Sequence, residues 1–63
     1  MNEYIVRYRI GTVWHEPYNT TTFNYYTELV EAETAKQAVR KEFSVYYFSN
    51  PNKFIELLSV KKV

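Results

Sequence analysis

The segment VEAETAKQAV, residues 30–39, decides the fold because it joins an expected strand to an expected helix. Within it, Thr34-Ala35-Lys36-Gln37 fits a capping box. In that motif the threonine hydroxyl and the glutamine side chain each satisfy a free backbone N–H group at the start of a helix. We therefore expect a helix to begin directly after Thr34.

The residues that follow predict an amphipathic helix that lies on a sheet. At 100° per residue one side of this helix is apolar and the other is polar. The apolar side gathers Ala35, Ala38, Val39, Phe43 and Tyr46. We expect the helix to fray over residues 47–49, before the breaker cluster around Pro51.

The residues on both sides of the helix predict three strands. Glu3–Trp14 alternates apolar and polar residues, and Thr21–Ala32 and Phe54–Val60 are rich in residues that favour strands. Residues 15–19, which contain Pro17, provide the turn between the first two strands. Gly11 interrupts the first strand, where we expect a bulge or a bend.

This order of elements predicts a single α+β domain over residues 1–63 with the topology ββαβ. Strand one should lie between strands two and three and run antiparallel to both, giving the order 2-1-3. With one helix on one face, the opposite face stays open. It should offer Ile5, one stripe of strand-two aromatic residues and apolar positions of strand three.

Composition limits the chemistry that the chain can perform. It has 63 residues, one histidine, one glycine and no cysteine, and its net charge is +1. These counts leave no hydrolytic triad, no metal-ligand set and no glycine-rich phosphate loop, so we expect no enzymatic activity, no cofactor and no metal. His15 is expected to be an exposed turn residue. A core this small without disulfides favours oligomerisation, so a homodimer is expected.

The segment after Met1 has neither a basic leader nor a long apolar run, so we expect no signal peptide and no membrane-spanning helix. The expected compartment is the cytoplasm.

The function that the sequence favours is binding to another protein. The residues expected to make the contact are Trp14, Tyr18 and Tyr26 of the hairpin, with Arg7 and Arg9 behind them. Tyrosine, tryptophan and arginine are the residue types enriched at interaction hot spots.

Two alternatives remain open. Arg7, Arg9, Trp14, Lys61 and Lys62 could bind single-stranded nucleic acid on an arginine and aromatic sheet face. The small core also suits an accessory subunit of a larger assembly.

Glu42 conflicts with the helical pattern because it falls inside the apolar arc, where an unpaired carboxylate is costly to bury. Either it pairs with a tyrosine hydroxyl or an arginine of strand one, or the helix ends early enough to expose it. Its place near the helix C-terminus favours exposure.

The junction over residues 30–39 resembles that of small ββαβ accessory proteins encoded by phages and plasmids. In those proteins an alternating strand ends in alanine, a capping residue follows, and an alanine begins the helix. The resemblance covers the junction alone. It implies a free-standing protein of a mobile element that binds and inhibits a host defence or regulatory protein.

Overall fold

The computed structural model describes the whole chain, Met1–Val63, and confirms the predicted ββαβ topology. Its elements are β1 (Asn2–Trp14), β2 (Thr20–Ala32), α1 (Ala35–Phe43) and β3 (Lys53–Lys62). The sheet order is β2-β1-β3, and β1 is antiparallel to both neighbours, as expected.

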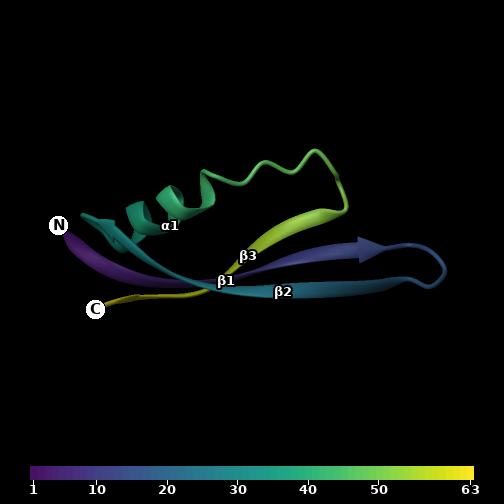
Figure 1. Cartoon of the computed structure of the whole chain (residues 1–63), viewed down its shortest axis with the longest axis horizontal. Helices are drawn as coiled ribbons and strands as arrows, with labels where there is room; N and C mark the ends of the chain where they lie inside the picture. Colours follow the sequence, from purple (N-terminus) through teal and green to yellow (C-terminus); the bar gives the residue numbers. More distant parts are fainter.

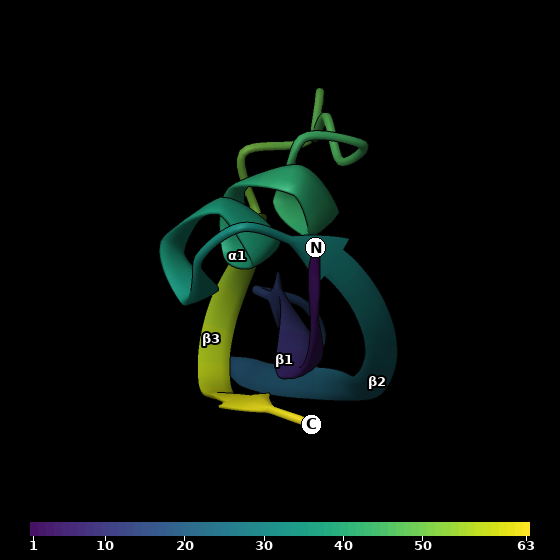
Figure 2. The same cartoon turned by 90° about the vertical axis from the view of Figure 1, so that its left-hand side faces the viewer.

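The molecule is elongated because the β1–β2 hairpin extends well beyond the helix (Figure 1). Its principal dimensions are 47 × 19 × 13 Å. Seen from the end, the sheet is curved, and α1 covers its concave side (Figure 2). The convex side has no element packed against it, so the structure has the open sheet face that the topology predicts.

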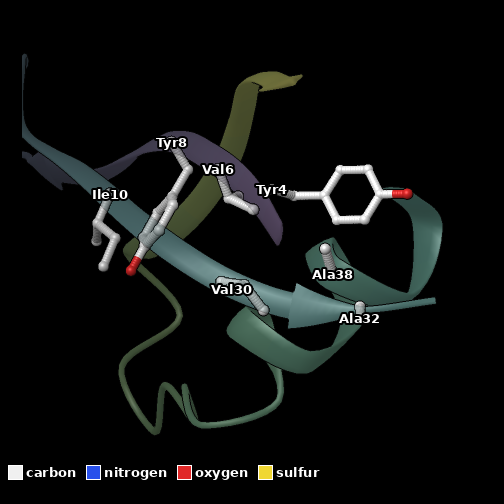
Figure 3. Close-up of a cluster of buried hydrophobic side chains, with 7 residues drawn as sticks. All are labelled: Tyr4, Val6, Tyr8, Ile10, Val30, Ala32 and Ala38. Carbon is white, nitrogen blue, oxygen red and sulfur yellow. The ribbon is translucent and has the colours of Figure 1, made fainter. Parts of the chain in front are cut away.

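The core lies between α1 and the half of the β1–β2 hairpin that is farther from the turn. Alternate residues of β1 point toward α1, because successive side chains of a strand point to opposite faces. Val6 and Tyr8 are completely buried there, together with Ala38 of the helix (Figure 3). The other buried apolar residues are Tyr4, Ile10, Val30 and Ala32.

The start of α1 follows the predicted capping box. The Thr34 hydroxyl accepts a hydrogen bond from the backbone N–H of Gln37 at 3.2 Å. The Gln37 side chain in turn accepts one from the backbone N–H of Glu33, also at 3.2 Å. Two N–H groups at the helix entrance are thereby satisfied, which fixes where the helix begins.

The predicted end of the helix was wrong, since α1 stops at Phe43 rather than fraying over residues 47–49. The Ser44 hydroxyl donates to the Lys41 carbonyl at 2.8 Å, and the N–H of Tyr46 donates to the carbonyl of Phe43 at 3.1 Å. This tightened last turn directs the chain along the sheet, where Tyr46 and Phe48 pack against the core.

The predicted bulge or bend at Gly11 was also wrong. The pairing of β1 with β2 is continuous, and the irregularity lies in the β1–β3 pairing between Arg7 and Tyr8, where Leu58 has no partner. Gly11 serves a different purpose, because the ring of Phe54 lies directly over it on the open side.

Candidate functional site

The open face is the side of the sheet opposite α1, and it carries the odd-numbered residues of β1 and β2. The register pairs Arg9 with Tyr25 on β2 and with Glu56 on β3, so these three residues lie side by side across the sheet. Gly11 is flanked in the same way by Phe23 and Phe54. These rows place an arginine, a glutamate and three aromatic rings next to one another.

Arg9 is held in place from two sides. Its Nε and Nη2 atoms donate to the same oxygen of Glu56, at 3.1 and 3.0 Å. Its guanidinium carbon lies 4.0 Å from the centroid of the Phe23 ring, the geometry of a cation–π contact. The side-chain contact with Tyr25, and then Glu56, raises the pKa of Arg9, so the guanidinium stays charged.

Phe23 and Phe54 form an aromatic pair that crosses the central strand. Their ring centroids are 6.0 Å apart with planes at 85°, an edge-to-face arrangement. Phe23 also lies 6.5 Å from the ring of Tyr25. Because Gly11 has no side chain, the Phe54 ring can lie across β1 and reach Phe23. We call Arg9, Phe23, Tyr25, Phe54 and Glu56 the Arg9 cluster.

Apolar side chains appear again at the other end of the open face, beyond a polar row formed by Arg7, Thr27 and Ser59. Tyr25 is 65% exposed and Leu29 is 61% exposed, and Leu29 pairs with the half-buried Ile5 of β1. Large side chains left in water over adjacent strands are typical of a surface that a partner covers. The predicted contribution of Ile5 and a strand-two aromatic stripe to this face is confirmed.

The structure does not bring the predicted contact residues onto one surface. Arg7 and Arg9 lie on the open face, whereas Tyr26 lies on the helix side, stacked on Tyr8 at 5.3 Å between ring centroids. Trp14, half exposed at the end of the hairpin, donates its indole N–H to the Thr22 hydroxyl at 2.9 Å. Arg7 and Arg9 therefore do not belong to the same surface as Trp14 and Tyr26.

Two further exposed residues lie in the turn between the hairpin strands. Tyr18 is 78% exposed there, and His15 is exposed as expected. Neither residue is close in register to the Arg9 cluster.

The basic residues considered for nucleic acid are divided in the same way. Lys61 pairs with Ile5 and shares the open face with Arg7 and Arg9, whereas Lys62 pairs with Tyr4 and lies on the helix side. Acidic residues balance the open face, since Glu56 binds Arg9 and the Glu3–Glu31 pair lies at its end. The open face is therefore mixed in charge rather than basic.

Sequence reasoning missed Phe23 and Glu56 as partners of Arg9, and Phe54 as the ring that packs on Phe23. The signal that could have found Phe23 is the hairpin register, whereas Glu56 and Phe54 depend on the register of β3. A turn over residues 15–19 pairs Trp14 with Thr20, and counting back along both strands places Tyr25 opposite Arg9 and Phe23 opposite Gly11. Residue type alone does not distinguish Tyr25 from Tyr26, which face opposite sides.

The helix side contains one partly buried polar cluster. Tyr8 donates its hydroxyl hydrogen to Glu42 Oε2 at 2.7 Å, and the Tyr46 hydroxyl lies 2.5 Å from the same Tyr8 oxygen. Since Tyr8 has only one hydrogen to give, Tyr46 donates to it. Burial, followed by the hydrogen bonds with Tyr46 and Glu42, raises the pKa of Tyr8 well above its usual range.

This cluster corrects the expectation that Glu42 is exposed. The other interpretation, in which Glu42 pairs with a tyrosine hydroxyl, is the one that the structure supports. Because Tyr8 is completely buried, its hydroxyl is inaccessible to a substrate and serves the core.

No group of three or more histidine, cysteine or acidic side chains is placed to hold a metal ion. The only helix, α1, is far too short to cross a bilayer. Comparisons with protein-family models, with curated proteins and with solved structures find no match for the chain.

Proposed function

We propose that this chain is a non-enzymatic protein-binding module that contacts its partner through the open face. The observation that supports this proposal is the Arg9 cluster, with its exposed Tyr25, on the same face as the exposed Leu29. Arginine and tyrosine are hot-spot residues, and a guanidinium already fixed by Glu56 and Phe23 loses little conformational freedom on binding.

The charge of the open face favours a protein over a nucleic acid. Binding to a phosphate backbone requires several cations that are free to replace counterions. Arg9 is already paired with Glu56, and the same face that carries Arg7 and Lys61 also carries Glu3 and Glu31. Arg9 also covers one face of the Phe23 ring, so that face is not available for a base to stack on.

The proposal also covers the kind of partner, the compartment and the oligomeric state. The partner is a host defence or regulatory protein that the chain inhibits, as the phage and plasmid resemblance implies. The compartment is the cytoplasm, which fits a small chain without cysteine. The chain self-associates as a homodimer, which fits a core of few buried residues.

The size of the core favours one second candidate, an accessory subunit of a larger assembly. Only 9 of the 63 residues are buried, so contacts with other subunits would add to a small core. Such a subunit should unfold at a lower denaturant concentration alone than in its assembly. Cooperative unfolding of the lone chain that does not depend on concentration would count against this candidate.

The protein-binding proposal is tested in two steps. Proteins captured from a host lysate by the immobilised chain are identified and purified, and each is then titrated with the chain by calorimetry. Two variants change the open face on the central strand, Ile5→Glu and Arg9→Ala, and Lys36→Glu changes the exposed side of α1 as a control.

We expect each open-face variant to weaken binding at least about tenfold and the control to bind like the native chain. Circular dichroism shows whether the variants keep their fold. The proposal is wrong if no purified partner binds, or if the folded open-face variants bind as tightly as the control.

A further inference from the structure

One edge of β2 has no neighbouring strand. Successive residues of a strand direct their N–H and C=O groups to opposite edges, so the residues that face this free edge can be identified. The carbonyl of Glu3 accepts from Val63, and the N–H of Val13 donates to Asn52, so odd-numbered residues of β1 direct these groups toward the β3 side. Even-numbered residues of β1 therefore bond to β2, where the register pairs them with even-numbered residues. The odd-numbered residues of β2 are left with outward N–H and C=O groups.

One end of this edge is already occupied. The Lys41 ammonium donates to the outward carbonyl of Glu31 at 3.0 Å. The free groups therefore run from Thr21 to Leu29, and Tyr25 lies at the centre of that segment.

The edge of β2 also lacks the features that keep edge strands apart. Proteins protect such edges with lysine, proline, bulges or short strands. On the other edge, β3 has Lys53, Lys61 and Lys62 and an irregularity at Leu58. By contrast, β2 is 13 residues long, has no lysine, arginine or proline, and pairs with β1 without interruption.

We infer that the free edge of β2 pairs with β2 of a second copy, antiparallel, about a two-fold axis at Tyr25. This register pairs every free group between Thr21 and Leu29, because the segment is symmetric about Tyr25. It places Tyr25 beside its own counterpart, Phe23 beside Thr27 of the second copy, and Leu29 beside Thr21 of the second copy. The two sheets become one continuous sheet with both helices on the same side.

The charge pattern of β2 fits a second copy in this orientation. Its acidic residues, Glu28 and Glu31, are confined to the half next to α1, and the half next to the turn is uncharged. Antiparallel pairing about Tyr25 sets Glu28 beside Thr22 of the second copy. Parallel pairing in register would set each glutamate beside its own counterpart, which is unfavourable.

This inference deepens the proposed function, on which it rests, because it states how the proposed homodimer forms. Joining the two sheets also joins the two open faces, so the two Arg9 clusters lie on one surface and meet at the Tyr25 pair. A partner would meet this doubled surface rather than a single face.

The test is the apparent molecular mass of the native protein in solution across a concentration series, measured by sedimentation and by light scattering. Tyr25→Lys and Tyr25→Glu each place like charges at the two-fold axis, and we expect each to raise the dimer dissociation constant at least about tenfold. An equimolar mixture of the two variants should dimerise again, because opposite charges then face each other. Tyr18→Lys, the same change at an exposed turn residue, should dimerise like the native chain.

A native chain that stays monomeric at every concentration would overturn the inference, as would Tyr25 variants that dimerise normally or a mixture that stays monomeric. Pairing of the β2 edge with a strand of another protein alone would also overturn it. Failure here is distinguishable from failure of the proposed function, since Ile5 and Arg9 lie on the central strand and away from the β2 edge.

Discussion

The ring of Phe54 occupies the space that a side chain on Gly11 would need. A Cβ atom placed on Gly11 would clash with the Cζ atom of Phe54, and the two flanking ring atoms would also lie closer than 3.0 Å to it. The backbone of Gly11 does not have a positive φ, so any L residue could adopt its conformation. The glycine is therefore required by the close approach of the ring.

We expect Gly11→Ala to destabilise the chain by about 1–3 kcal/mol, because the Phe54 ring must move away from Phe23 to make room. Alanine is intrinsically better than glycine in a strand, so a loss of stability would come from this clash. The measurement is the free energy of unfolding in urea. In a Phe54→Ala background the same change should cost nothing, and an equal cost in both backgrounds would contradict the explanation.

The Thr34 hydroxyl is expected to contribute to stability through the helix cap. Thr34→Ala removes the acceptor of the Gln37 N–H and should lower the free energy of unfolding by about 1 kcal/mol. Thr34→Ser keeps a hydroxyl at the same place and should be close to the native value. Equal stability of the two variants in urea denaturation would show that the cap hydrogen bond contributes little.

Much of the fold could be predicted because each element has a local cause. Alternation along β1 defines which side chains are buried, and the capping box defines where α1 begins. The crossover through one helix then leaves the order 2-1-3 as the favoured arrangement. The end of α1 has no such local signal, since no glycine or proline follows before Pro51. Packing of Tyr46 and Phe48 on the core decides it instead.

The candidate site could be predicted only in part, because a face depends on register and not on residue type. Alternation along β1 is enough to place Arg7 and Arg9 on one face, but only the register shows that the aromatic residue beside Arg9 is Tyr25. Tyr26 is a hot-spot residue type, but it is one position away, and that difference places it against Tyr8 in the core. Glu56, which binds Arg9, and Phe54, which packs on Phe23, both come from β3, and the register of β3 includes an irregularity that no local sequence signal marks.

The Glu42 carboxylate is expected to stabilise the core as the acceptor of the Tyr8 hydroxyl. Glu42→Leu leaves that buried hydroxyl without its carboxylate acceptor and should cost about 1–3 kcal/mol. Glu42→Gln keeps an acceptor oxygen and should cost less. The measurement is urea denaturation at neutral pH. A leucine variant as stable as the native chain would mean that apolar packing compensates for the lost hydrogen bond.

The raised pKa of Tyr8 predicts that the chain loses stability in alkali. The folded state holds the Tyr8 proton more tightly than the unfolded state, in which the pKa is about 10. Below pH ~10 both states are protonated, so the stabilisation is fully present. As the pH rises above that value, only the unfolded chain releases the proton. Tyr8 alone should then lower the free energy of unfolding by about 1.4 kcal/mol per pH unit.

Tyr8→Phe separates this effect from alkaline denaturation in general. The variant should be less stable at neutral pH, because Glu42 and Tyr46 lose a partner, but its stability should fall less steeply above pH ~10. Tyr18→Phe, at an exposed tyrosine, should keep the native slope. The measurement is urea denaturation at a series of alkaline pH values. If the native chain and Tyr8→Phe lost stability with the same slope, Tyr8 would not be the group that holds its proton in the folded state.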